Sequence, residues 1–210
     1  MSRLSRREIL QGIRTRSLLE ATRKIIAAKG FDAVTMEAVA SEAGITKGGV
    51  YLYFRNKDEM VLAAIEDVAS KMMGEIEKQV EPHAPSWERL CQTIRAQLEI
   101  MERHQDLLRT LLLDRRLLRD SPGGKQSQRL LRYRRRHEAQ LKEMLDEGVR
   151  GKKFYPMDTA RAAFYINEMT ISTAQRRMLG LSRSSLERDS QALLRFIALL
   201  LRDKKTLLQT

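Results

Sequence analysis

Residues 44–60, "GITKGGVYLYFRNKDEM", combine side chains that bind phosphate with glycines that permit close approach. Ammonium groups attract phosphate oxygens, and phenolic hydroxyls donate hydrogen bonds to them. Glycine lacks the side chain that would hold a helix backbone away from another molecule. The members of this set are Lys47, Gly48, Gly49, Tyr51, Tyr53 and Lys57. Their spacing predicts a surface that binds a polyanion.

Two short helices are expected to position these groups. Thr35 precedes "MEAVASEA" and Thr46 precedes "KGGVYLYF", and threonine is a favourable N-cap residue for each. Gly44 lies between the two segments, where a tight turn is needed. Two short helices joined by a glycine-containing turn form a helix-turn-helix, whose second helix places its first residues in the major groove of DNA. The pattern therefore predicts that Thr46 and Lys47 face duplex DNA.

A small helical subdomain with an aromatic core and a basic rim is the alternative interpretation of these residues. Val50 and Phe54 lie four positions apart on one helix face, and we expect them to be core residues. Packing alone does not explain the lysines, tyrosines and glycines, so DNA binding is favoured. The net charge of +12 agrees with a polyanionic partner, but charged runs also form ordinary solvated faces.

Composition and motifs argue against several other classes of protein. The single cysteine, Cys91, cannot form an internal disulfide, and the three histidines are too scattered to predict a metal site. No nucleophile–base pair, carboxylate dyad or phosphate loop suggests catalysis, so we expect neither an enzyme nor a bound cofactor. No run is long enough to span a membrane, and the N-terminus lacks the apolar centre of a signal peptide, so a cytoplasmic protein is expected.

Helical periodicity runs through all 210 residues, with Gly and Pro confined to breaks. Ser5 and Glu8 fit a capping box for a first helix that ends at Lys29, and Asn56 can cap a long helix from Lys57. Later helices are expected near 86–103, 106–118, 122–149, 157–180 and 184–205. The sequence thus predicts an all-α protein with a helix-turn-helix domain at 1–56 and a second helical domain at 57–210.

The segment "GFDAVTMEAVASEAGITKGGVYLYFRNKDEM" resembles the N-terminal domain of the TetR family of bacterial transcriptional regulators. The match covers residues 14–65 and includes the "GF" after the first helix, the threonine that opens the second, "AGITKG" and "YLYF". The resemblance implies about nine helices, a palindromic operator, a homodimer built on the last two helices, and an effector pocket in residues 57–210. The DNA contacts it implies are Thr35, Thr46, Lys47, Gly48, Tyr51, Tyr53 and Lys57. Gly49 replaces a residue that often bears a side chain, and we include it because its backbone can approach DNA.

The second domain gives weaker indications of a ligand site. One side of the expected helix 86–103 is apolar, and a stripe of this kind is more typical of a core than of a pocket. Asn167 interrupts another apolar stripe, so it needs a polar partner, either a ligand or a neighbouring helix. The candidate ligand contacts are Trp87, Cys91, Leu98, Tyr133, His137, Phe164, Asn167 and Glu168.

These expectations lead to a DNA-binding transcriptional regulator with two alternative modes of action. In the first, a repressor leaves its operator when a small lipophilic effector stabilises a dimer state that does not fit the DNA. In the second, the same DNA-binding head organises or occludes DNA without an effector. The arginine-rich run at 115–136 suggests an anionic head group on the effector. A solvated face that raises the potential toward DNA is the favoured explanation of that run.

Overall fold

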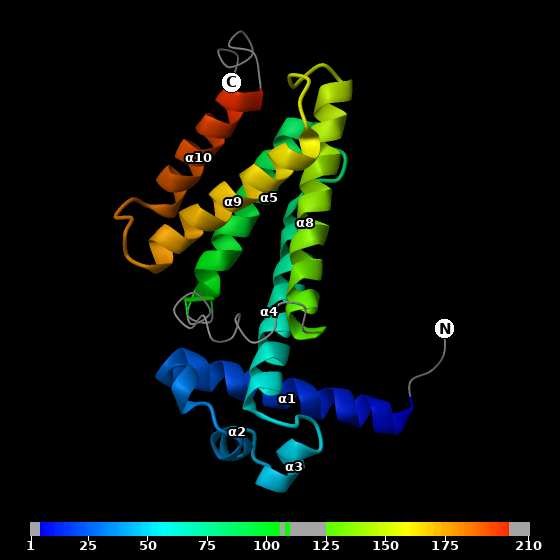
Figure 1. Cartoon of the computed structure of the whole chain (residues 1–210), viewed down its shortest axis with the longest axis vertical. Coiled ribbons are helices and arrows are strands. Elements are labelled where there is room, and N and C mark those ends of the chain that lie inside the picture. The colour runs from blue at the N-terminus through cyan, green and yellow to red at the C-terminus, as the bar shows by residue number, and fades with distance from the viewer. Residues whose placement is uncertain (1–4, 106–107, 110–124, 202–210) are drawn as a thin grey trace. The chain divides into compact units, whose positions relative to one another are not determined.

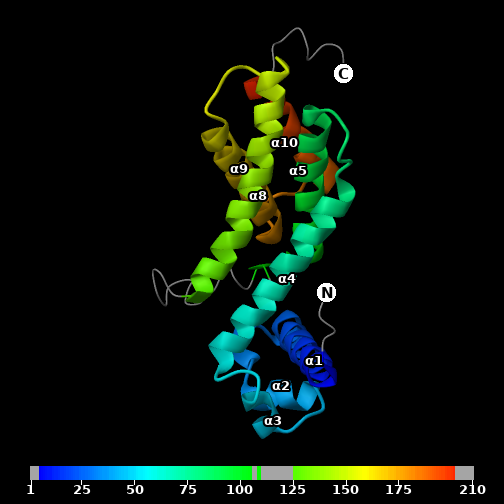
Figure 2. The same ribbon diagram turned by 90° about the vertical axis from the view of Figure 1, so that its right-hand side faces the viewer.

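The computed structural model describes residues 5–105, 108–109 and 125–201. Within these ranges the chain forms eight α-helices, one short 3₁₀ helix and no strand (Figures 1 and 2). The elements are α1 (Arg6–Lys29), η1 (Phe31–Ala33), α2 (Met36–Glu42), α3 (Lys47–Tyr51), α4 (Lys57–Gln79), α5 (Ser86–Arg103), α8 (Lys125–Arg150), α9 (Thr159–Met178) and α10 (Leu186–Leu201). The all-α prediction is confirmed. Most of the expected helix at 106–118 lies outside the described residues.

The described residues divide into two compact units. The first contains residues 5–69, 108–109 and 125–127, and the second contains residues 70–105 and 128–201. The border between the units falls within α4.

In the first unit, α2 packs against both α1 and α3 (Figure 1, blue to cyan). Leu18 of α1, Val39 of α2 and Val50 of α3 are almost completely buried and form the centre of this core. Gly30 and Gly44 follow α1 and α2 with φ angles of 79° and 66°, a left-handed conformation that favours glycine. The two glycines therefore end their helices where the sequence predicted.

The third helix is shorter than the expected segment 47–54. Regular α-helix ends at Tyr51, and the amides of Tyr53 and Phe54 both donate to the Val50 carbonyl in a closing turn. Two glycines weaken the helix from within, and Asn56 begins the next one. The side chain of Asn56 accepts a hydrogen bond from the Glu59 amide at 2.8 Å, which confirms its predicted role as a cap.

In the second unit, α5 packs against α9 and α10, α9 also packs against α10, and hydrogen bonds join α8 to α5 and α9 (Figures 1 and 2). Leu90, Ile94 and Leu98 of α5 are almost fully buried. The same is true of Leu141 on α8 and Ile197 on α10. One apolar side of each helix therefore contributes to a common core.

Candidate nucleic-acid interface

The second and third helices begin in the same way, with a threonine side chain that caps the first turn. Thr35 Oγ1 accepts a hydrogen bond from the Ala38 amide at 3.0 Å, and Thr46 Oγ1 accepts one from the Gly49 amide at 3.1 Å. Both threonines have extended backbone conformations, as N-cap residues require. The caps predicted from the sequence are confirmed, and they fix where the side chains that follow them point.

The third helix separates its residues into an exposed face and a buried face. Thr46, Lys47 and Tyr51 are exposed, whereas Val50 and Phe54 are buried. Tyr51 is 49% exposed. The face expected to contact DNA is therefore exposed to solvent in the first unit, and the two residues expected to be core are in the core.

The two glycines of the third helix have different surroundings. A Cβ atom added to Gly48 would have nothing within 4 Å, so this position is open to a partner molecule. A Cβ atom at Gly49 would lie 3.3 Å from Thr46 Oγ1 and 3.4 Å from the Ile45 side chain. A side chain at Gly49 would crowd the threonine cap, which gives this glycine a structural role as well as the expected one.

The remaining two predicted DNA contacts are half-buried. Tyr53 lies in the turn that follows α3. Lys57, the first residue of α4, places its Nζ 4.0 Å from the centre of the Phe31 ring. The aromatic face attracts the ammonium group and restricts its motion. The Lys57 ammonium group is therefore held in a defined position beside the helix-turn-helix.

Two residues of this surface were not predicted from the sequence. Glu37 of α2 forms an ion pair with Lys47 of α3, and both side chains remain more than half exposed. This pair joins residues ten positions apart, a spacing that no helical periodicity indicates. Leu52 is 82% exposed, beside the exposed Tyr51. If this helix faces DNA as expected, an apolar side chain so open to solvent can contact a thymine methyl group.

Some of the candidate ligand contacts come together in the second unit, and others do not. Asn167 and His137 are buried and belong to one polar cluster, in which the half-buried Glu168 pairs with Arg134. The Arg134 guanidinium lies 6.0 Å from the centre of the partly exposed Phe164 ring. Among the remaining candidates, Trp87 is half-buried and packs edge-on against Phe154. Cys91 and Tyr133 are also half-buried, and Leu98 is fully buried.

The buried polar cluster forms a chain of hydrogen bonds across three helices. The Glu138 carboxylate accepts from Asn167 Nδ2 at 3.3 Å, and Asn167 Oδ1 accepts from Gln97 Nε2 at 3.1 Å. Gln97 Oε1 lies 2.9 Å from His137 Nε2. Because a carboxylate only accepts, these directions require His137 to carry its proton on Nε2. Burial lowers the pKa of His137 to about 4, so the ring is neutral at pH 7.

Gln97 and Glu138 of this cluster were not among the predicted residues, and Arg134 was expected only as part of the arginine-rich run at 115–136. The sequence does carry a signal for Gln97, because it is a polar residue flanked by Ile94 and Leu98 on an apolar helix face. Asn167 was expected to need either a ligand or a neighbouring helix. Its hydrogen bonds to α5 and α8 show that neighbouring helices supply partners for it.

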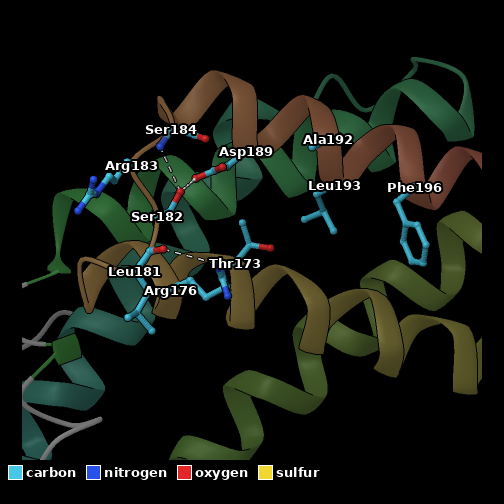
Figure 3. A pocket seen from close by; sticks show the side chains of 10 residues that line it. All are labelled: Thr173, Arg176, Leu181, Ser182, Arg183, Ser184, Asp189, Ala192, Leu193 and Phe196. Carbon is cyan, nitrogen blue, oxygen red and sulfur yellow. Dashed lines mark hydrogen bonds between the residues drawn. The ribbon is translucent and has the colours of Figure 1, made fainter.

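A crevice with a volume of about 440 Å³ lies where the loop between α9 and α10 folds over both helices (Figure 3). On the polar side of the crevice, Asp189 accepts a hydrogen bond from the Ser182 hydroxyl at 2.8 Å. Leu193 and Phe196 of α10 form its apolar side, and Phe196 is 51% exposed. Further large apolar side chains are exposed on the same two helices and their loop: Phe164, Tyr165, Leu179, Leu181, Leu199 and Leu200.

Neither a metal-binding cluster nor a membrane-spanning helix is found in the part of the chain that the structure describes. No group of three or more His, Cys, Asp or Glu side chains there is arranged to hold a metal ion. Each described helix is too short or too polar to cross a membrane.

Both units match protein families. A model for bacterial regulatory proteins of the tetR family matches residues 18–64, and a model for a tetracyclin repressor-like C-terminal domain matches residues 83–175. The regulator YhgD of Bacillus subtilis (strain 168) is 24% identical over 160 residues, which are 76% of this chain and 81% of YhgD. The regulator YerO of the same organism is 34% identical over 99 residues. These residues are 46% of this chain and 34% of YerO.

A solved structure of similar fold covers most of this chain. It is a transcriptional regulator from Saccharomonospora viridis in complex with choline, with a TM-score of 0.77 and 18% identity, covering 92% of this chain and 100% of that protein. The family models match one stretch in each domain, and the capped helix-turn-helix lies within the first of them. The chain therefore belongs to the TetR family of bacterial transcriptional regulators, which are DNA-binding proteins and not enzymes.

Proposed function

We propose that this chain is a repressor that binds a palindromic operator as a homodimer and leaves it when a small lipophilic effector binds. The observation that carries this proposal is the exposed face of α3, where Thr46, Lys47 and Tyr51 are open to solvent on a helix fixed by its cap. We assign DNA binding to residues 1–56, and dimerisation and effector binding to residues 57–210. The predicted contacts are those named from the sequence, with Gly48 as the point of closest backbone approach.

The exposed apolar face of α9 and α10 supports the homodimer. One side of α10 is buried through Leu194, Ile197 and Leu201, whereas Phe196 and Leu200 on its other side are 51% and 55% exposed. Several large apolar side chains exposed on neighbouring helices are typical of a protein–protein interface. A second copy of the same chain offers an identical face, so a two-fold axis can bring the two together.

Two observations bear on the effector. A relative with the same fold holds choline, a small organic molecule, which supports a ligand-responsive second domain. The arginines that suggested an anionic head group are less available than expected, because Arg134 pairs with Glu138 and Glu168 and Arg136 pairs with Glu77 at 2.7 Å. Arg115, Arg116 and Arg119 lie outside the described residues. An anionic head therefore stays a prediction, and we propose only that the effector is small and lipophilic.

DNA occlusion without an effector is the second candidate, and the buried polar cluster favours it. Gln97 already hydrogen-bonds both His137 and Asn167, so a ligand that used these side chains would have to replace those bonds. Thermal stability measured across a panel of cationic, neutral and anionic lipophiles separates the two. A true effector at a hundred times its dissociation constant adds about 2.7 kcal/mol. Stabilisation by no compound would support occlusion.

Selection of bound duplexes from a random DNA library tests the DNA-binding part of the proposal. The wild-type protein should enrich a palindrome with half-sites about one helical turn apart, roughly 34 Å. Lys47→Ala removes an exposed charge and leaves the core intact, so this variant should enrich the palindrome poorly. Enrichment of no sequence, or equal enrichment by both proteins, would contradict the assignment of α3.

A further inference from the structure

We infer that Glu37 is a specificity-determining residue, which weakens binding to non-operator DNA by keeping Lys47 paired. The inference rests on the proposed function, because it requires Lys47 to contact DNA phosphate. Glu37 is the second residue of α2 and Lys47 is the first residue of α3, so each belongs to the first turn of its helix. The carboxylate is thus part of the surface assigned to DNA, where a negative charge is unexpected.

The ion pair is formed between fully ionised and accessible groups. A hydrogen bond from Lys47 lowers the pKa of the Glu37 carboxyl, and the same bond raises the pKa of the Lys47 ammonium. Both groups are therefore charged at neutral pH. The side chains are 59% and 52% exposed, so neither is held by packing and the pair can open.

This arrangement affects non-operator DNA more than operator DNA. Non-specific affinity comes almost entirely from lysine and arginine side chains that replace the counterions of phosphates. A lysine that keeps its carboxylate partner replaces fewer counterions, and the carboxylate itself is repelled by the phosphates. On the operator, base-edge contacts made by the rest of α3 stabilise the complex and offset the loss of the ion pair. Glu37 therefore raises the ratio of operator affinity to non-operator affinity.

Glu42 provides a matched control on the same helix. It pairs with Lys24 of α1 at 3.5 Å, its side chain is 42% exposed, and its replacement changes the net charge by the same amount. Glu37→Gln and Glu42→Gln therefore differ in position and not in charge. Circular dichroism of both variants should match the wild type, because both ion pairs are exposed.

The measurement is binding to a fluorescent non-operator duplex by anisotropy at several KCl concentrations. Glu37→Gln should bind about fivefold more tightly than wild type, the upper range for an exposed pair, and its salt dependence should steepen by about 0.9 in slope. Glu42→Gln should change both quantities much less. Combined with Lys47→Gln, Glu37→Gln should have no more effect than Glu42→Gln has, because the lysine that it releases is gone.

The operator duplex obtained by selection completes the test. Operator affinity of Glu37→Gln should rise less than non-operator affinity, so the specificity ratio should fall about two- to fivefold. Equal effects of the two glutamine variants on non-operator DNA would overturn the inference. A fall in operator affinity alone would overturn it in another way, since Glu37 would then read a base directly. Failure of the wild type to bind any duplex would instead overturn the proposed function, and this inference with it.

Discussion

Replacement of Arg177 by methionine should destabilise the second unit, because this arginine joins three of its helices. Its Nε and one terminal nitrogen donate to the two oxygens of Glu102 on α5 at 2.6 and 2.7 Å. The other terminal nitrogen donates to Asp189 of α10 and to the Ser184 carbonyl, both at 2.8 Å. The Arg177 side chain is only 14% exposed, so water cannot readily take its place.

The size of the effect follows from what methionine leaves behind. Glu102 and Asp189 would keep their charges at 34% and 19% side-chain exposure, with the Ser182 hydroxyl still bonded to Asp189. Removing one partner from a fully buried ion pair destabilises a protein by about 3–5 kcal/mol, and the partial exposure of Glu102 reduces this to about 2–3 kcal/mol. Arg177→Lys should lower the free energy of unfolding by roughly half as much, because an ammonium group cannot form the two parallel hydrogen bonds to Glu102.

Urea unfolding at fixed protein concentration, followed by tryptophan fluorescence, measures this difference. The chain has one tryptophan, Trp87, and its ring lies 6.4 Å from that of Phe154 within the second unit. Its emission therefore reports on the unit that contains Arg177. Arg176→Met is the control, because the neighbouring Arg176 is exposed and bonds only weakly to the Leu181 carbonyl, at 3.4 Å. The control should change the free energy of unfolding by less than about 0.5 kcal/mol.

The pH dependence gives a second check. The hydrogen bond from Arg177 lowers the pKa of Glu102. Burial alone would raise the pKa of Asp189, but hydrogen bonds from Arg177 and Ser182 outweigh it and lower that pKa too. Lowered folded-state pKa values stabilise the fold above the unfolded values of 4.5 and 3.8, and this contribution is lost as the pH falls through the folded values. The difference in the free energy of unfolding between wild type and Arg177→Met should be largest at pH 7 and shrink below about pH 4. A variant as stable as wild type at pH 7 would refute the reasoning.

Three further predictions concern other parts of the second unit. Phe196→Glu combined with Leu200→Glu should give monomers with at least about tenfold weaker operator binding, and a dimer in sedimentation would contradict the proposed interface. Gly148→Ala should destabilise the protein by about 1–3 kcal/mol in urea, because the new Cβ would lie less than 3.0 Å from the buried Phe154 ring. Unchanged stability would show that the ring can move aside. Gln97→Leu should lower the free energy of unfolding by about 1–3 kcal/mol by leaving buried polar groups without partners, and a neutral or stabilising result would mean that the cluster does not stabilise the core.

The DNA-binding head was predictable because its signals are short in range. Thr35 and Thr46 each lie three residues from the amide that they cap, so a few letters of sequence define each helix start. The glycines after α1 and α2 mark the turns through the conformation that they alone adopt easily. The length of α3 was wrong, because helix propensity does not show where a tightening turn replaces a helix.

The polar interior of the second unit could not be predicted in the same way. Gln97 and Asn167 are bonded across 70 positions of sequence, and Arg177 meets Glu102 across 75. Helical periodicity shows which side of a helix is apolar and says nothing about which polar residue on another helix will face it. Asn167 was identified as a residue in need of a partner, but the partner itself depends on how the helices pack.

Hydroxyl-radical footprinting of the selected operator with wild type and Lys47→Ala tests the central claim most directly. We expect two protected half-sites, roughly 34 Å apart between centres, for the wild-type dimer. Lys47→Ala should require about tenfold or more protein for the same protection, with an unchanged circular dichroism spectrum. Equal protection by both proteins, or a single protected site without two-fold symmetry, would contradict DNA binding by the exposed face of α3 in a homodimer.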